Sequence, residues 1–207
     1  MVTITDPKEV DRILKKKSFK VVIFGSARLK PGNFAYDEVF NLAEMIGARG
    51  MDLVTGGGPG LMEAAGLGHH KGRTSKKAKS IGLAIHIPHE RIRKAGIDVE
   101  TNFTNFSDRL EEFELLANAI VIAPGGVGTM LEFFYTWQLL QTRKIKHIPV
   151  IMLGEIWVEF MRWIKNHPVK HGFIDDEETE LIHVTKNYKE AMEIIEGEYK
   201  KYKKANK

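Results

Sequence analysis

The chain has 207 residues, a formal net charge of +4 and no cysteine. Its length is that of one α/β domain, so we expect a single domain over residues 1–207. Without cysteine, disulfides, thiolate metal sites and cysteine nucleophiles are excluded. No apolar run approaches the roughly 20 residues that span a bilayer, and the N-terminus lacks a signal-peptide pattern, so we expect a cytoplasmic protein without membrane contact. The lysine excess is spread over both ends and one loop, which argues against a nucleic-acid partner.

Strand-like and helix-like segments alternate along the chain. Residues 1–18 are expected to form a short surface helix that begins after Asp6, and residues 196–207 form a basic tail. A polar, basic loop is expected at 69–79. The alternation predicts a three-layer, Rossmann-like α/β fold with a mostly parallel sheet flanked by helices. Strands are expected at 20–24, 51–54, 80–85, 99–103, 119–123 and 147–153, and helices at 36–49, 61–68, 106–118, 130–141, 157–164 and 188–204.

Two glycine-rich turns join a strand to a helix, at 124–129 (PGGVGT) and at 56–60 (GGGPG). Glycine permits backbone conformations that let amide N–H groups approach a ligand closely at the positive end of a helix. Both turns therefore predict a phosphate site. Thr129 is expected either to cap its helix or to donate its hydroxyl to the same anion. Ser26 follows the first strand, and it is either a ligand contact or an ordinary turn residue, because ligands gather at the carboxyl ends of parallel strands.

Two charged residues on either side of the strand and turn at 119–129 are candidates for catalysis. Glu132 follows the turn at 124–129 by one helical turn, and it is either a functional acid or an acid that favours the helix N-terminus. Arg109 precedes the strand at 119–123, and it is either a functional cation or an ion-pair partner of Glu112 or Asp108.

We expect no metal site. The histidine pairs at 69–70 and 167–171 have no nearby carboxylate pattern that completes a set of ligands. Three acidic side chains are expected to form a solvated face rather than a metal site: Glu111, Glu112 and Glu114.

Three segments together resemble the Lonely Guy (LOG) family, whose members also carry the label "possible lysine decarboxylase". These segments are 24–28 (FGSAR), 56–65 (GGGPGLMEAA) and 124–132 (PGGVGTMLE), and the similarity runs from about residue 20 to about residue 195. The resemblance implies a Rossmann-like homodimer that acts on a small-molecule nucleotide without a cofactor. It implies a phosphoribohydrolase, which cleaves the N-glycosidic bond of a nucleoside 5′-monophosphate to release ribose 5-phosphate and a free base that can be a cytokinin.

The resemblance also assigns residues to roles. Arg109 and Glu132 match the residues regarded as catalytic in the family. Leu110 stands where the family usually has lysine, and Leu131 stands where it usually has a second acid, which bears on the substrate range. The residues that match the phosphate and nucleotide pocket are Gly25, Ser26, Gly57, Gly58, Gly60, Leu61, Met62, Pro124, Gly125, Gly126, Gly128 and Thr129.

The same chemistry can be argued from the residues. Cleavage of an N-ribosidic bond passes through an oxocarbenium-like sugar, which the Glu132 carboxylate can stabilise while it orients or deprotonates the attacking water. The helix N-termini after the glycine turns would bind the 5′-phosphate and fix the sugar in place. Arg109 would either hold the phosphate or carry charge near the departing base.

Three other functions are weighed against this hydrolase. A non-catalytic carrier of a nucleotide or of molybdenum cofactor would use the same turns, and Leu110 and Leu131 are compatible with lost catalysis. A lysine decarboxylase needs an electron sink such as pyridoxal phosphate on a lysine, and no lysine lies in the glycine motifs. A dinucleotide-dependent oxidoreductase is poorly supported, because the turn at 56–60 lacks the G-x-G-x-x-G spacing and follows the second strand.

Overall fold

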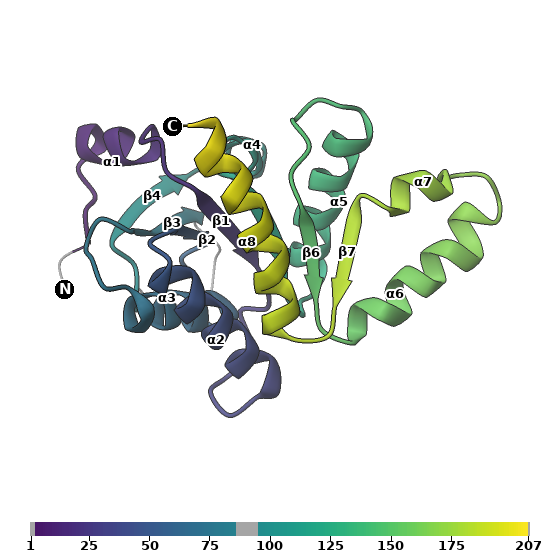
Figure 1. Ribbon diagram of the computed structural model, residues 1–207, viewed down its shortest axis with the longest axis horizontal. Helices are drawn as coiled ribbons and strands as arrows, with labels where there is room; N and C mark the ends of the chain where they lie inside the picture. The colour runs from purple at the N-terminus through teal and green to yellow at the C-terminus, as the bar shows by residue number, and fades with distance from the viewer. Residues whose placement is uncertain (1–2, 86–94, 207) are drawn as a thin grey trace.

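A seven-stranded, entirely parallel β-sheet forms the centre of the molecule (Figure 1). The computed structural model describes residues 3–85 and 95–206. The strands are β1 (Lys20–Phe24), β2 (Asp52–Thr55), β3 (Ser80–Ile85), β4 (Val99–Phe103), β5 (Ala119–Ile122), β6 (Val150–Leu153) and β7 (Ile182–Thr185). Their order in the sheet is β4-β3-β2-β1-β5-β6-β7.

The strand order reverses between β1 and β5. From β1 the chain builds outward through β2, β3 and β4, and it then returns to place β5 on the other side of β1. In an open parallel sheet, such a reversal opens a crevice at the carboxyl ends of the two central strands, where ligands bind. The topology thus places the loops after β1 and β5 side by side at one edge of the sheet.

Helices cover both faces of the sheet, which confirms the three-layer Rossmann-like prediction. One apolar core lies between the sheet and α2, α3 and α8, and the other lies between the sheet and α1, α4, α5 and α6. Strand β1 serves both cores, because Val21 and Ile23 face one helical layer while Val22 and Phe24 face the other. The helices are α1 (Pro7–Leu14), α2 (Phe34–Ala48), α3 (Leu61–Gly72), α4 (Phe106–Leu116), α5 (Val127–Gln141), α6 (Ile156–Ile164), the π-helical turn η1 (Lys165–Val169), α7 (Asp176–Thr179) and α8 (Tyr188–Ala205).

Local sequence signals explain where several helices begin and end. The Asp6 side chain accepts a hydrogen bond from the Glu9 backbone N–H, and Pro7 occupies the first position of α1, as the sequence predicts. Asn187 caps α8 in the same way through the backbone N–H groups of Lys189 and Glu190. This helix continues through Ala205, so most of the basic tail is helical.

Three sequence predictions about elements are wrong. Strand β7 was not expected, because its four residues alternate from buried to exposed and back within a short segment at the sheet edge. Residues 69–72 belong to α3 rather than to a loop, since His69 is fully buried and its Nε2 lies 2.9 Å from the Met51 carbonyl oxygen. Glu114 does not lie on a solvated face, since only 8% of it is exposed.

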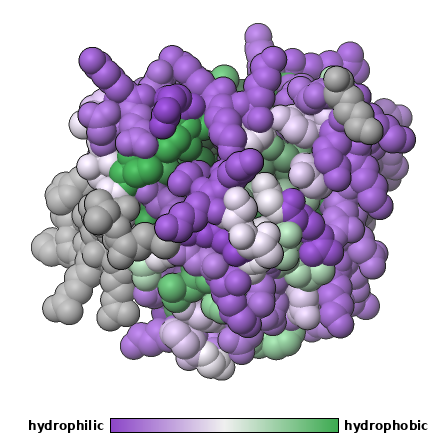
Figure 2. Space-filling model, turned by 60° about the vertical axis from the view of Figure 1, so that its left-hand side comes forward, coloured by the Kyte–Doolittle hydropathy of each residue, from purple (hydrophilic) through white to green (hydrophobic). Residues whose placement is uncertain are grey.

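Hydrophilic side chains dominate the face of the molecule shown in Figure 2. On the face shown in Figure 2, hydrophobic side chains gather in a few patches between them. No helix in the described part of the chain combines the length and the apolar character of a transmembrane span.

Candidate active site

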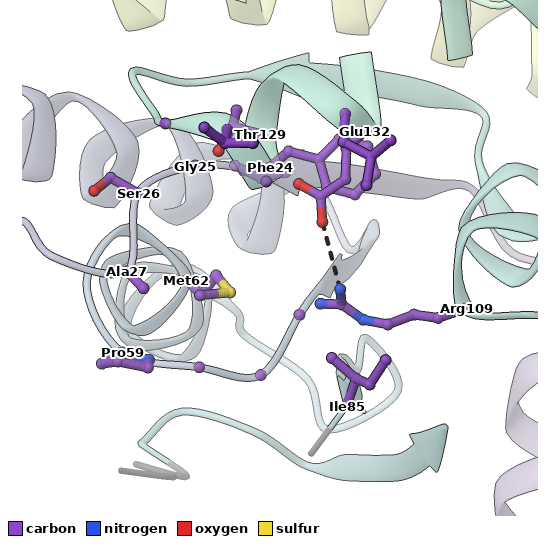
Figure 3. A pocket seen from close by; sticks show the side chains of 18 of the residues that line it. Phe24, Gly25, Ser26, Ala27, Pro59, Met62, Ile85, Arg109, Thr129 and Glu132 are labelled. Carbon is purple, nitrogen blue, oxygen red and sulfur yellow. Dashed lines mark ion pairs between the residues drawn. The ribbon is translucent and has the colours of Figure 1, made fainter. Parts of the chain in front are cut away.

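A cavity of about 520 Å³ opens at the carboxyl ends of the central strands. The loop after β1, the glycine turn after β2, the end of β3 and the first turns of α4 and α5 together form its wall (Figure 3). The cavity therefore lies where the strand order reverses, at the position that the topology favours for a ligand.

The glycine turn after β2 contains positions at which only glycine fits. Gly57 and Gly60 both have a φ of +71°, in the left-handed region that other residues rarely adopt. A Cβ atom at Gly60 would also collide with the carbonyl oxygen of Ser26. At Gly56, a Cβ would collide with the guanidinium of Arg109. The turn thus allows both the β1 loop and the Arg109 side chain to approach the backbone closely.

The N-terminus of α5 is open towards the cavity. Gly126 precedes the first helical residue, and no side chain among the described residues caps this end of the helix. A Cβ at Gly126 or Gly128 would meet no atom within 4 Å, so free space lies directly over the first turn. Uncapped N–H groups at the positive end of a helix are a site for an anion such as phosphate.

Thr129 does not cap α5, so the first of the two roles expected for it is wrong. The helix begins at Val127, so Thr129 lies within the first turn, where its side chain packs against Gly125 and is almost completely buried. Its side chain lines the cavity, so the role of hydroxyl donor to an anion remains a prediction.

Arg109 is a buried cation whose contacts include a hydrogen bond, an aromatic ring and an ion pair. Its Nε donates a hydrogen bond of 2.7 Å to the Leu83 carbonyl oxygen, and its guanidinium lies 5.0 Å from the centre of the Phe113 ring. Its Nη1 forms an ion pair of 3.5 Å with Oε1 of Glu132. Figure 3 shows the two side chains pointing at each other across the cavity, from α4 and α5.

Glu132 is a desolvated acid rather than a capping residue. It lies in the second turn of α5, beyond the positions that interact with the helix N-terminus, and 13% of its side chain is exposed. Burial raises its pKa to about 7, and the neighbouring Arg109 charge offsets part of this effect. A carboxyl group with a pKa close to neutral can exchange protons with a substrate or a water molecule.

Most of the predicted site residues come together in this cavity. The predicted residues that line it are Gly25, Ser26, Gly57, Gly58, Met62, Arg109, Gly126, Gly128, Thr129 and Glu132. Four others lie outside its lining. Gly60 faces an adjoining cavity of about 300 Å³, Leu61 is fully buried beneath Gly25, and Pro124 and Gly125 lie in the backbone of the turn before α5.

The sequence did not point to several apolar residues of the lining. Phe106 precedes Arg109 by one helical turn on α4, while Ala84 and Ile85 end β3 beside the turn after β2. The signal that could have found the last two is their place at the carboxyl end of a strand next to β2. Leu110 and Leu131 line the same cavity, so both departures from the LOG pattern lie at the site itself.

Within the described ranges, no three His, Cys, Asp or Glu side chains are arranged to hold a metal ion. His69 is fully buried, and its ring contacts the backbone of Met51. His70 lies 3.3 Å from Asp98.

Comparison with models of known protein families identifies the family of this chain. The model of the family described as "Possible lysine decarboxylase" matches residues 62–195, which is more than half of the chain. The chain belongs to this family. The LOG resemblance of its motifs is thereby confirmed.

The chain is similar to a curated enzyme and to solved structures of other proteins. The pyrimidine/purine nucleotide 5′-monophosphate nucleosidase of Escherichia coli K12 is 30% identical over 146 residues, which is 65% of this chain and 30% of the relative. The chain thus spans less than a third of the length of this curated relative. The molybdenum cofactor binding protein of Rippkaea orientalis superposes with a TM-score of 0.65 at 17% identity, over 88% of this chain and 98% of the other. The molybdenum cofactor carrier protein of Chlamydomonas reinhardtii gives 0.60 at 20% identity, over 88% and 99%. These structures share the fold.

Proposed function

We propose that this protein hydrolyses the N-glycosidic bond of a nucleoside 5′-monophosphate. The observation that carries the proposal is the Arg109–Glu132 ion pair, which lies in the same cavity as the uncapped glycine N-terminus of α5. An anion-binding helix end and a near-neutral carboxyl group in one cavity fit a substrate that has a phosphate at one end and a bond to be hydrolysed at the other. The name of the E. coli relative and the LOG resemblance support the same class of reaction.

In the proposed reaction, the 5′-phosphate binds at the first turn of α5, beside Gly126 and Gly128. The backbone N–H groups there are fixed before the substrate arrives, so binding the phosphate positions the sugar at little further cost. Because Glu132 lies one turn further along the same helix, this placement brings the ribose close to its carboxylate.

At the sugar, Glu132 acts on the water that attacks C1′. The C1′–N bond breaks as positive charge develops on the sugar, and the ionised carboxylate of Glu132 stabilises this charge and accepts a proton from the attacking water. The base leaves with the bonding electron pair and takes up a proton, so the products are the free base and ribose 5-phosphate. Arg109 holds the Glu132 carboxylate in place and partly neutralises it in the resting site.

We further propose which nucleobase the substrate carries. Phe106, Leu110 and Leu131 give the cavity an apolar side, and an apolar wall favours the flat face of a nucleobase over a charged group. AMP and cytokinin riboside monophosphates are the substrates that the LOG resemblance implies. The test is to assay release of base from AMP and from N6-isopentenyl AMP by the purified protein and by its Glu132→Gln variant.

A non-catalytic carrier is the second candidate. Leu110 and Leu131 replace charged residues of the family pattern at the cavity, and two structures that share the fold are molybdenum cofactor proteins. A carrier would bind AMP or a related nucleotide without releasing base, whereas the hydrolase releases it. The presence of Glu132, with its pKa raised by burial, favours the hydrolase.

We further propose that two copies of the chain associate through α4 and α5. Leu115 on α4 is 80% exposed, and Leu131 and Phe134 on α5 are 47% and 43% exposed. Large apolar side chains exposed on neighbouring helices are typical of an interface. Light scattering coupled to size-exclusion chromatography tests this, and the variant Leu115→Glu is expected to give a monomer.

A further inference from the structure

A second buried carboxyl group lies close to the proposed active site. Glu114 is on α4, the helix that carries Arg109, and it is 8% exposed. Its Oε1 lies 2.5 Å from Oγ1 of Thr136, a fully buried residue of α5, the helix that carries Glu132. Within residues 3–85 and 95–206, its Oε2 is buried and has no hydrogen-bond partner.

The hydroxyl group of Thr136 has two neighbours and a single hydrogen. Besides Glu114, its Oγ1 lies 2.9 Å from the backbone carbonyl oxygen of Glu132, one turn earlier on α5. An ionised Glu114 could only accept, so the carboxylate and the Glu132 carbonyl oxygen would compete for the single hydroxyl hydrogen of Thr136. A protonated Glu114 resolves the conflict, because the acid donates to Thr136 Oγ1 and the hydroxyl then donates to the Glu132 carbonyl oxygen.

We infer that Glu114 is a protonated acid that ties α4 to α5 through Thr136 and thereby positions Arg109 against Glu132. The inference rests on the proposed function for its effect on turnover, but the protonation of Glu114 can be measured without any activity. The chain of two hydrogen bonds ends at the carbonyl group of Glu132 itself, so it fixes the helical turn from which the catalytic side chain projects.

The surroundings of Glu114 favour its neutral form. Burial raises its pKa to about 7, with the hydrogen bond to Thr136 as the opposing effect. Of the other titratable groups on the two helices, Tyr135 interacts with Glu114, since the pKa of Tyr135 is raised by burial and by the charges of Glu111 and Glu114. Arg109 and Glu132 pair with each other. Ionisation of Glu114 would place an unpaired charge between two helices and remove the donor for Thr136.

The hydrogen-bonded link from Glu114 through Thr136 to the Glu132 carbonyl oxygen therefore exists only while Glu114 is protonated. The Arg109–Glu132 distance of 3.5 Å depends on the relative position of α4 and α5. When Glu114 ionises, the Thr136 hydroxyl donates to the carboxylate and no longer to the Glu132 carbonyl oxygen, so the link to Glu132 is lost and this distance is no longer held. Displacement of a catalytic group by about 1 Å can lower a rate by about 100-fold. We therefore expect turnover to fall as the pH rises above about 7.

The experiment compares three variants of the full chain with the wild type. In Glu114→Gln, the amide group can still donate to Thr136, so the variant is expected to retain most of the turnover and to lose its decline above pH 7. In Glu114→Leu and Thr136→Val, the link is absent, so kcat is expected to fall by about 10- to 100-fold while KM changes little. Glu111→Gln, at an exposed position of the same helix, is the matched control and should behave as the wild type.

Infrared spectroscopy measures the protonation state of Glu114 directly. The wild type is expected to show the carbonyl stretch of protonated carboxylic acids at pH values somewhat below 7, where both Glu114 and Glu132 hold a proton. Glu114→Gln should lose the part of this band that belongs to Glu114 and keep the part that belongs to Glu132. Absence of a band assignable to Glu114 would overturn the inference. So would a folded Glu114→Leu variant with unchanged kcat, or a Glu114→Gln variant as slow as Glu114→Leu. If the wild type released no base, the proposed function would fail, while the infrared band and the Arg109–Glu132 distance in a crystal structure of Thr136→Val would still decide about the link.

Discussion

Arg109 and Glu132 form an ion pair of 3.5 Å between two helices that meet at the carboxyl edge of the sheet. Neither side chain is more than 13% exposed, so the pair is largely withdrawn from water. A buried pair is costly to form, because the desolvation of two charges opposes their attraction, and it contributes little to stability by itself. Its position in a cavity beside an open helix N-terminus gives it a functional role in our account.

Replacing Glu132 with glutamine should stop the reaction and leave binding intact. Glutamine has nearly the same shape but can neither carry the negative charge nor accept the proton of the attacking water. We expect kcat to fall about 1,000-fold, in the range typical of a general base, and the Kd for AMP to change less than about threefold. Steady-state kinetics and calorimetric binding measure the two effects, with Glu111→Gln as the control at an exposed site. Retained turnover in Glu132→Gln would remove this residue from the mechanism.

The pH dependence of kcat/KM should report the pKa of Glu132. If the ionised carboxylate is the active form, kcat/KM rises with pH and levels off above about 7. This limb is best measured in Glu114→Gln, which removes the decline expected at higher pH. Adding Arg109→Met removes the charge that lowers the pKa of Glu132, so the rise should move to higher pH. A limb that stays in place or moves to lower pH would contradict this electrostatic assignment.

Alanine substitutions at two glycines of the α5 turn should weaken phosphate binding without disturbing the fold. Gly126 and Gly128 have no positive φ, and a Cβ at either would meet no atom within 4 Å, so alanine should be tolerated by the fold. The added methyl group would occupy the space that we assign to the phosphate, and loss of about one hydrogen bond to a charged group should raise the KM for AMP by about 10- to 100-fold. Unchanged KM values in both variants would place the phosphate elsewhere.

Gly197→Ala is the matched control for these two substitutions. Gly197 lies within α8, far along the chain from the glycine turns, and a Cβ there also meets no atom within 4 Å. Alanine should stabilise the helix by about 1 kcal/mol without altering the kinetics. By contrast, Gly60→Ala should unfold or strongly destabilise the protein, because Gly60 has a φ of +71° and contacts the Ser26 backbone. Thermal melts distinguish these outcomes.

The two raised carboxyl pKa values predict how stability depends on pH. Glu114 and Glu132 each have a pKa of about 7 in the folded protein, against 4.5 as the ordinary value, so the folded state holds more protons between these limits. Stability should therefore be highest below about pH 4.5 as far as these two groups are concerned, and should fall as the pH rises to about 7, by at most about 3 kcal/mol for each. Glutamine at either position should flatten this dependence. Urea unfolding at several pH values measures it, and an unchanged slope in both variants would show that neither acid is desolvated.

The sequence indicated much of this site because its signals are local. A short β-branched run, a glycine turn and a helical spacing are sufficient to predict β5, the turn and α5, and the carboxyl ends of parallel strands must share one edge. Arg109 and Glu132 were both selected from such patterns. Their contact was not predicted, because it depends on how α4 and α5 pack.

The residues that were misjudged depend on tertiary contacts. Glu114 looked like one of three solvated acids, although Leu110, Phe113, Glu114 and Ala117 follow the spacing of a single helix face, and that spacing could have placed it inside. Thr129 was expected as a cap only because the start of α5 was placed after it. Strand β7 has two buried residues out of four, which is too few for an apolar pattern to register.

The most direct test of the account is to incubate the purified protein with AMP, GMP, CMP, UMP and N6-isopentenyl AMP and to measure free base and ribose 5-phosphate by chromatography. We predict that at least one nucleotide gives base and ribose 5-phosphate in equal amounts, and that Glu132→Gln abolishes both. Bound AMP that is recovered intact, with no base released from any of the five nucleotides, would contradict the hydrolase and support a carrier.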